Sequence, residues 1–136
     1  MIRSASAVWN GNLKEGRGTF QVQSGTIKDQ KYTYRTRFEN DPGTNPEELV
    51  AAAHAACFSM ALSAQLGERG ITPASVETTS AITFEAGTLK KSHLTSTVRA
   101  PGADRAKVEE AAQAAKTGCP ISKALKMDIE LELKVV

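Results

Sequence analysis

The chain has 136 residues, a length that predicts a single domain. Lys and Arg together number 17 and Asp and Glu 15, and the formal net charge of +2 excludes a polybasic nucleic-acid arm or an acidic tail as the main feature. Aromatic residues make up only 5%, so the core must be built from aliphatic side chains and Ala, and such a small core favours dimerisation.

The N-terminal half of the sequence predicts strands first. MIRSASAVWNGN has no apolar stretch typical of a secretory signal peptide, so we expect a cytoplasmic protein. The segment VWNGNLKEGRGTFQVQSG indicates a strand, a turn and a second strand around residues 19–23. KYTYRTRF, residues 31–38, alternates residue by residue and predicts a third strand. An antiparallel meander is the simplest arrangement of the three.

A long helix follows. Asn45 is a good N-cap, Pro46 suits the first helical position, and Glu48 is placed to complete a capping box with Asn45. The helix should run to about Leu66 and end at Gly67 or Gly70.

This predicted helix contains 19 residues without a charge, 49–67, nearly enough to span a bilayer. It also contains His54, Ser59, Ser63 and Gln65 and is mostly Ala, which favours a helix buried on nearly all sides in a soluble protein over a membrane span.

The C-terminal half predicts two strands, two helices and a last strand. The strands cover residues 76–85 and 91–99, and a helix opens at PGAD and stops at Gly118. ISKALK predicts a short helix, and MDIELELKVV alternates as a strand. The order βββ-α-ββ-α-(α)-β, without repeat or linker, predicts one α+β domain over residues 1–136.

The two cysteines, Cys57 and Cys119, are too few for a disulfide framework and do not have zinc-site spacing. Cys57 is either a small buried hydrophobe or a nucleophile. It lies eleven residues beyond Pro46, too far for the helix dipole to lower its pKa, so a reactive Cys57 needs a cation from elsewhere in the fold. Cys119 follows a helix end, and spacing alone leaves open whether it meets Cys57.

Four other residues are candidates for a functional site, and each also has a purely structural interpretation. His54 lies one helical turn before Cys57 and could be a base, a metal ligand or a core histidine with hydrogen-bonded ring nitrogens. Together with His93 and the two cysteines it would make a Cys2His2 set, but the spacing matches no zinc site. Arg37 lies on the predicted third strand and is either a functional cation or an ordinary solvent-exposed strand residue. Glu47 is the carboxylate left free by the capping box and otherwise complements the helix dipole.

The block TRFENDPGTNPEELVAAAHAACFSMALS, followed by GCPIS at residues 118–122, closely resembles the OsmC/Ohr family of organic hydroperoxide reductases, most closely its OsmC branch (osmotically induced protein C). The VWNG and GRGT segments and the last strand also fit, so the resemblance covers essentially the whole chain. It implies an intertwined homodimer in which antiparallel β-sheets wrap long central helices.

The resemblance also implies a thiol peroxidase that reduces organic hydroperoxides to alcohols. Cys57 would be the peroxidatic cysteine and Cys119 the resolving one, with Arg37 and Glu47 as the family's arginine and glutamate; Arg17 is the fallback for the arginine. No metal or bound cofactor is implied, and an external dithiol, of the lipoyl type by family likeness, would reset the enzyme. Nucleic acid and membrane are not expected partners.

Two expectations come from geometry and composition. Glu47 and Cys57 are ten residues apart on one predicted helix, ~15 Å along its axis, so we expect Arg37 and Glu47 to act on Cys57 of the partner subunit. An apolar neighbourhood of Leu49, Val50, Phe58 and Met60 predicts a mouth that favours alkyl hydroperoxides.

Three other functions stay open on the sequence. The first is a redox sensor or binding dimer, in which the same disulfide switches a surface and turnover is incidental. The second is a structural dimer whose cysteines are core residues. The third is a metal protein.

Overall fold

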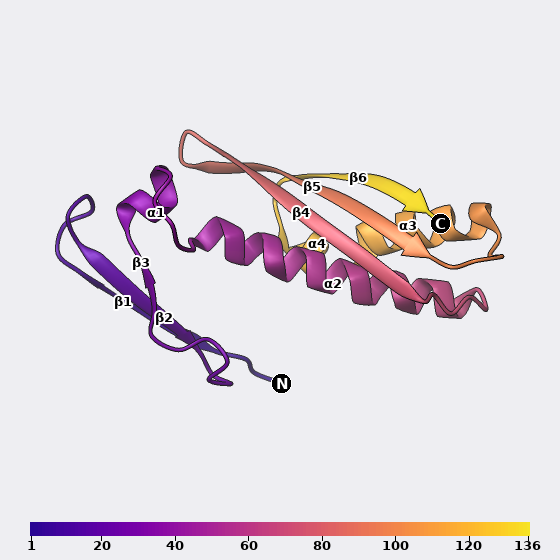
Figure 1. The fold of residues 1–136 in the computed structure, drawn as a ribbon, viewed down its shortest axis with the longest axis horizontal. Coiled ribbons are helices and arrows are strands. Elements are labelled where there is room, and N and C mark those ends of the chain that lie inside the picture. The colour runs from indigo at the N-terminus through magenta and orange to yellow at the C-terminus, as the bar shows by residue number, and fades with distance from the viewer. The chain divides into compact units, whose positions relative to one another are not determined.

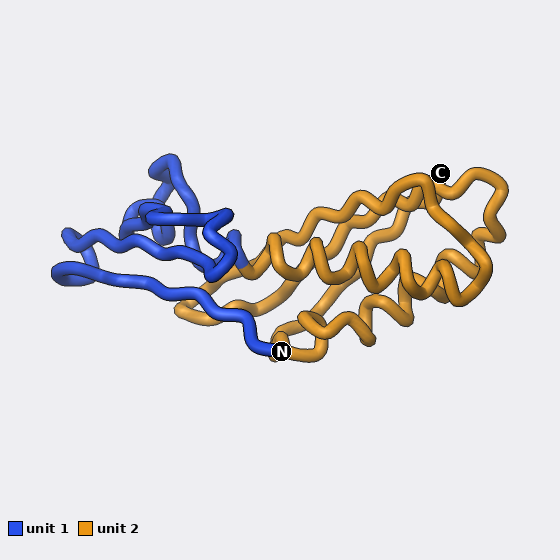
Figure 2. The backbone as a smooth tube through the Cα atoms, turned by 90° about the horizontal axis from the view of Figure 1, so that it is seen from below, with its two compact units in different colours: residues 1–49 blue, residues 50–136 orange.

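The computed structural model describes residues 1–136 and contains ten elements, β1–β3, α1, α2, β4, β5, α3, α4 and β6 (Figure 1). They form two compact units, residues 1–49 and 50–136 (Figure 2). The α+β class is confirmed, and the assignment of the whole chain to one domain stays a prediction.

The first unit is built on an antiparallel sheet of β1 (Ala5–Asn10), β2 (Arg17–Val22) and β3 (Gln30–Tyr32), in the order β1-β2-β3. Gly18 pairs with Trp9 on one side and Tyr32 on the other, and their ring centroids are 5.4 Å apart. A Cβ at position 18 would collide with both rings, so only Gly allows this stacking. The predicted meander is confirmed.

The third strand is shorter than predicted, because the chain turns into helix α1 (Tyr34–Phe38) after Tyr32. Thr33 is its N-cap: Thr36 N–H donates to the Thr33 hydroxyl, and Thr33 N–H donates to the Thr36 hydroxyl. The rings of Tyr34 and Phe38 stack one helical turn apart, with centroids 4.8 Å apart. These local contacts overcome the strand-like alternation.

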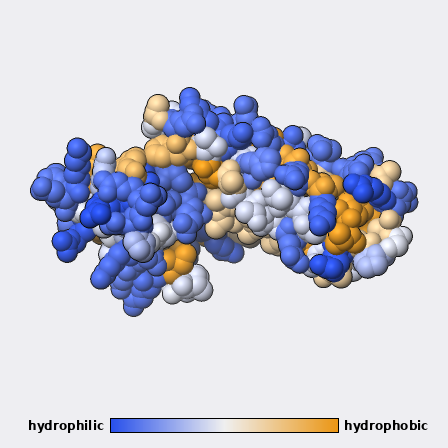
Figure 3. All heavy atoms as spheres, turned by 45° about the horizontal axis from the view of Figure 1, so that its top comes forward, coloured by the Kyte–Doolittle hydropathy of each residue, from blue (hydrophilic) through white to orange (hydrophobic).

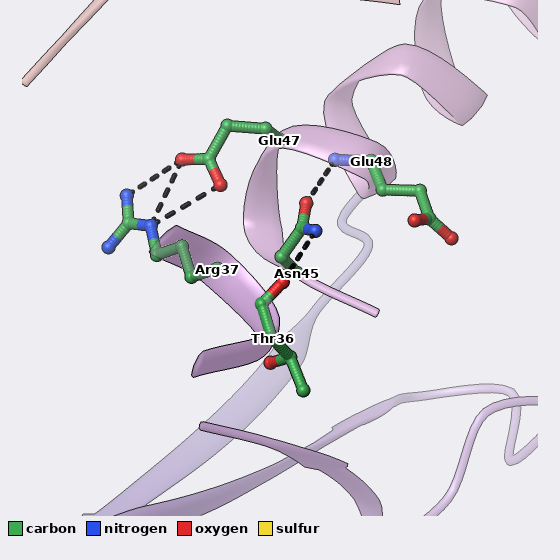
Figure 4. Close-up of polar contacts among 5 residues, drawn as sticks. All are labelled: Thr36, Arg37, Asn45, Glu47 and Glu48. Atoms are coloured by element: carbon green, nitrogen blue, oxygen red, sulfur yellow. Dashed lines mark hydrogen bonds and ion pairs between the residues drawn. The ribbon is translucent and has the colours of Figure 1, made fainter. Parts of the chain in front are cut away.

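Helix α2 (Pro46–Glu68) begins as predicted. The Asn45 side chain accepts the Glu48 N–H at 2.8 Å and donates to the Thr36 carbonyl at 3.0 Å (Figure 4). The Glu48 carboxylate accepts from the Thr44 hydroxyl at 3.4 Å instead of closing a capping box on Asn45.

Within one chain α2 buries a narrower surface than the burial on nearly all sides that its composition predicts. The buried stripe recurs at every fourth residue, His54, Phe58, Leu62 and Leu66. The opposite surface is open, and Met60 is 77% exposed, because the sheet of one chain covers only one face of the helix. By length and composition alone α2 also satisfies the criteria for a membrane span, with 22% of that window buried.

The second unit packs α2 and two later helices on a three-stranded sheet. β4 (Ser75–Glu85) and β5 (Thr88–Arg99) form an antiparallel hairpin, and β6 (Asp128–Val135) lies on the other side of β5. β6 runs parallel to β5, which departs from the expected antiparallel sheets. The connection through α3 (Arg105–Gly118) and α4 (Pro120–Ala124) is long enough for a parallel crossover.

The core of this unit is aliphatic and Ala-rich, as the composition predicts. Its buried apolar residues come from α2, from the end of β5 and from α3: Phe58, Leu62, Leu66, Leu94, Val98, Ala100, Val108, Ala111, Ala112 and Ala115. Apolar side chains also reach the surface of both units (Figure 3), among them Val8, Leu13 and Met60.

The β4–β5 hairpin contains an alanine in a conformation that favours other residues. Ala86 and Gly87 form its two-residue turn with φ of 49° and 74°. A positive φ at both positions is typical of a type I′ turn, in which Asn-Gly is preferred. We expect Ala86→Asn to raise the free energy of unfolding by about 0.5–1 kcal/mol, measured by urea denaturation. The control Gly87→Ala should lower it, and an unchanged or lower midpoint for Ala86→Asn would contradict the expectation.

Candidate functional site

The structure brings the two cysteines into direct contact. Cys57 lies on α2 and Cys119 links α3 to α4, 62 residues later, and their sulfur atoms are 2.8 Å apart. Both are free thiols, with Cys57 partly exposed and Cys119 buried. Spacing in the sequence left open whether Cys119 meets Cys57, and in the structure the two thiols form one site.

Local sequence explains how Cys119 is placed. Helix α3 ends at Gly118, and Pro120 occupies the first position of α4, so Cys119 is at once the C-cap of one helix and the N-cap of the next. Its N–H donates to the Ala115 carbonyl at 2.9 Å, and its carbonyl accepts from Lys123 N–H at 3.1 Å. Both neighbouring helices therefore fix the backbone of Cys119.

Within one chain, the environment does not activate Cys57. Burial and the hydrogen bond with Cys119 raise the pKa of the Cys57 thiol, against a hydrogen bond from the Ile121 backbone. Burial also raises the pKa of the Cys119 thiol, but hydrogen bonds from Cys57 and Ser122 outweigh it and hold that pKa below its ordinary value. A reactive Cys57 thus needs a positive charge beside it, as the distance from the helix N-terminus predicts.

Arg37 and Glu47 form a close ion pair in the first unit (Figure 4). Arg37 Nη2 lies 2.8 Å from Glu47 Oε1, and Arg37 Nε lies 3.1 Å and 3.3 Å from the two carboxylate oxygens. The pair joins α1 to the first turn of α2, where Glu47 is also favoured by the helix dipole. Arg37 lies on a helix and not on the predicted strand.

The arginine that meets Glu47 is Arg37, while the fallback Arg17 lies on β2 opposite Asn10. The Arg37 guanidinium also lies over the Phe38 ring, 5.1 Å from its centroid. Only 13% of the Glu47 side chain is exposed, so this ion pair is better shielded from water than an ordinary surface pair.

An apolar cavity of about 190 Å³ lies beside Arg37. Besides Arg37 and Thr33 it is lined by apolar and aromatic side chains, Trp9, Leu13, Tyr32, Tyr34 and Phe38. Leu49, Val50, Phe58 and Met60, the expected lining of an apolar mouth, do not line this cavity. Phe58 was predicted wrongly as part of such a mouth, because its side chain is completely buried in the core.

The two histidines lie in different environments. His54 is buried between the hydroxyls of Ser92 and Ser122. His93 is partly exposed on β5, and its Nδ1 is 2.9 Å from Glu130. The two histidines and two cysteines are not gathered into one Cys2His2 set, and no group of three or more His, Cys, Asp or Glu side chains is placed to bind a metal ion.

Sequence reasoning missed two parts of this region. The serines that hold His54 were overlooked, although Ser92 and Ser96 alternate with Leu94 and Val98 on the buried face of β5. The aromatic lining beside Arg37 was missed as well, because Tyr34 and Phe38, one helical turn apart, were assigned to a strand.

The family described as OsmC-like protein matches residues 38–134, more than half of the chain. The chain belongs to this family. This OsmC-like protein is 46% identical to peroxiredoxin OsmC of Escherichia coli, over 98% of the chain and 96% of that relative. It is also 38% identical to the organic hydroperoxide resistance protein OhrB of Bacillus subtilis, over 71% of the chain and 74% of the relative.

A solved structure shows the same fold at low sequence identity. The OsmC-like protein from Mycoplasma pneumoniae is 14% identical to this OsmC-like protein and matches with a TM-score of 0.78, over 100% of this chain and 98% of that one. The resemblance to the OsmC/Ohr family is confirmed by the family match and by both relatives.

Proposed function

We propose that this OsmC-like protein is a cysteine-based peroxidase that reduces organic hydroperoxides to alcohols. The contact between the Cys57 and Cys119 sulfur atoms carries the proposal, because a thiol peroxidase of this type needs a second thiol within reach of the first. The printed names of the relatives, peroxiredoxin OsmC and organic hydroperoxide resistance protein, support it.

The first step is peroxide reduction by Cys57. Its thiolate attacks the terminal oxygen of the hydroperoxide, the S–O bond forms and the O–O bond breaks. Cys57 becomes a sulfenic acid, and the alkoxide takes up a proton to give the alcohol. The sulfur is oxidised and the peroxide is reduced, so the step needs no other oxidant.

Arg37 has two tasks in this step. A guanidinium beside the Cys57 sulfur lowers the pKa of the thiol, and full conversion of an ordinary thiol to thiolate at neutral pH raises the reactive fraction by about 30-fold at most, a gain of roughly 2 kcal/mol. An efficient peroxidase needs more than that. A guanidinium aimed at the leaving oxygen also stabilises the charge that develops there, which is usually the larger effect. Glu47 orients Arg37 by the two-oxygen ion pair.

The ion pair acts on the Cys57 of a second subunit. Because α2 is one continuous helix, Glu47 and Cys57 are ten residues, or ~15 Å, apart along its axis. The open face of α2 around Met60 offers apolar surface for a second copy of the chain. The working form is then a cytoplasmic homodimer with two shared sites.

Cys119 completes the cycle. It attacks the Cys57 sulfenic acid, a disulfide forms, and water leaves. This step protects Cys57 from irreversible over-oxidation. An external dithiol, of the lipoyl type, then reduces the disulfide by thiol exchange, and no metal or bound cofactor takes part.

The cavity beside Arg37 favours an organic substrate. Its aromatic lining gives the alkyl or aryl part of a hydroperoxide an apolar surface, while the guanidinium faces the polar peroxide group. Hydrogen peroxide has no group to fill this cavity and should react less efficiently.

Steady-state kinetics tests the proposal. We expect the protein to consume cumene hydroperoxide continuously with dihydrolipoamide, and less efficiently with thioredoxin, with a higher kcat/KM than for hydrogen peroxide. Equal or greater efficiency with hydrogen peroxide would overturn the substrate class. A single equivalent consumed with either reductant, without turnover, would instead support the redox-sensor function.

A further inference from the structure

His54 is a fully buried titratable residue that the proposed mechanism does not use. It lies on the core-facing stripe of α2, among residues that are otherwise apolar, Phe58, Leu62 and Leu66. A buried imidazole is costly unless both ring nitrogens have hydrogen-bond partners.

Both ring nitrogens do have partners, and these come from two other elements. Nδ1 is hydrogen-bonded to the Ser92 hydroxyl of β5 at 2.7 Å, and Nε2 to the Ser122 hydroxyl of α4 at 2.8 Å. The Ser92 hydroxyl continues to the Ser80 hydroxyl of β4 at 2.9 Å. Burial lowers the pKa of His54, so the ring is neutral, with one nitrogen as donor and the other as acceptor. The ring is therefore fixed in orientation between the sheet and α4.

The contact between His54 and Ser122 lies one helical turn from the contact between the two cysteines and joins the same two segments. His54 and Cys57 are three residues apart on α2, and Cys119 and Ser122 are three residues apart at the start of α4. His54 meets Ser122, and Cys57 meets Cys119. Two side-chain pairs, one helical turn apart, thus join the same two segments. Since α4 has only five residues, it depends on such contacts for its position.

We propose that His54 and Ser122 are positioning residues for the resolving step, which hold Cys119 against Cys57 once Cys57 is oxidised. This inference rests on the proposed peroxidase function. In that step the Cys119 sulfur attacks the sulfur of the Cys57 sulfenic acid, the S–S bond forms and the S–O bond breaks. The departing hydroxide combines with the proton lost by Cys119 to give water, so atoms and electrons balance.

A positioning role affects the rate of disulfide formation alone, whereas a purely structural role would affect both chemical steps. In the proposed mechanism peroxide reduction depends on Cys57 and the arginine, whereas the hydrogen bond of the His54–Ser122 pair joins α2 to α4. Disulfide formation depends on where Cys119 lies. Ser122→Ala removes the hydrogen bond with His54 and also the side-chain hydrogen bond that lowers the pKa of the Cys119 thiol, so it should slow resolution alone, by about tenfold or more.

Ser122→Ala tests this in rapid mixing of the reduced full-length protein with cumene hydroperoxide. We expect sulfenic acid formation to stay within about twofold of wild type, disulfide formation to slow about tenfold, and the sulfinic fraction at excess peroxide to rise, as read by intact mass and thiol titration. Ser122→Thr, which keeps the hydroxyl, should restore rapid disulfide formation. His54→Leu leaves the Ser122 hydroxyl beside Cys119, so slowed disulfide formation in this variant reports the positioning contact alone. His54→Asn, whose shorter side chain cannot span both serine hydroxyls, takes its place if His54→Leu does not fold, and wild-type disulfide formation in the folded His54 variant would overturn the inference.

The matched control is Ser59→Ala. It removes another hydroxyl contact of α2 with the sheet, Ser59 to Thr78 at 2.8 Å, away from the Cys119 segment. It should leave the ratio of disulfide to sulfinic product unchanged. Disulfide formation at the wild-type rate in Ser122→Ala, equal slowing of both steps, or the same shift in Ser59→Ala would overturn the inference. If wild type itself forms no disulfide with hydroperoxide, the proposed function fails instead.

Discussion

Replacing Cys57 by Ser should reduce peroxide consumption by roughly 10³-fold or more, because a serine hydroxyl stays protonated near neutral pH and is a poor nucleophile toward an O–O bond. Cys57 is partly exposed and lies 2.8 Å from Cys119, so the substitution removes the reacting atom without opening the core. The measurement is consumption of cumene hydroperoxide with dihydrolipoamide as reductant.

The variant Cys119→Ser tests the role of the resolving cysteine in the same assay. It keeps the attacking sulfur and removes the resolving one, so we expect the first equivalent of hydroperoxide per site to be consumed and a sulfenic acid to accumulate on Cys57. Excess peroxide should then convert it to sulfinic acid. Full activity of Cys57→Ser, or continuous turnover at the wild-type rate by Cys119→Ser, would show that the assigned roles are wrong.

The second large effect concerns the subunit that supplies the arginine. Burial raises the pKa of the Cys57 thiol, and in the proposed site Arg37 counteracts this, so Arg37→Met should lower activity by about 10²–10³-fold. Heterodimers of Cys57→Ser and Arg37→Met protomers, isolated through two different tags, should regain one working site. In that site the intact Cys57 of one protomer meets the intact Arg37 of the other.

A reciprocal heterodimer distinguishes an arginine that acts across the interface from one that acts within its own chain. It pairs a wild-type protomer with one that carries both Cys57→Ser and Arg37→Met. If the arginine acts across the interface, neither of its sites is complete, and it should be nearly inactive. If the arginine acts within its own chain, this heterodimer keeps one working site and the first heterodimer has none. That reversed pattern would rule out the shared site.

Sequence patterns predict the elements whose signals are local. The start of α2 at Asn45 and Pro46, the stop at Gly118 and the alternation of the last strand are all found in the structure. They are predictable because capping, glycine stops and period-two burial depend on neighbouring residues. The same local reasoning failed at 33–38, where alternation suggested a strand and a reciprocal Thr33–Thr36 cap makes a helix.

The site was less accessible to sequence reasoning, because it depends on residues far apart in the chain. The contact of Cys119 with Cys57 joins residues that are 62 positions apart, and no local pattern indicates it. The pairing of Arg37 with Glu47 followed only from the family resemblance. The surroundings of His54 involve serines 38 and 68 residues away, and small hydroxyl residues in a strand give no distinctive signal.

The wide separation of the two cysteines along the chain has a thermodynamic consequence. A disulfide between residues 62 apart closes a long loop, and the chain-entropy relation gives such a cross-link up to ~4 kcal/mol of stabilisation through the unfolded state. In the proposed cycle each turnover would alternate between a reduced form with a lower free energy of unfolding and an oxidised form with a higher one. When reductant runs short and the oxidised form accumulates, the enzyme would then resist heat and proteolysis best under the oxidative stress it is proposed to relieve.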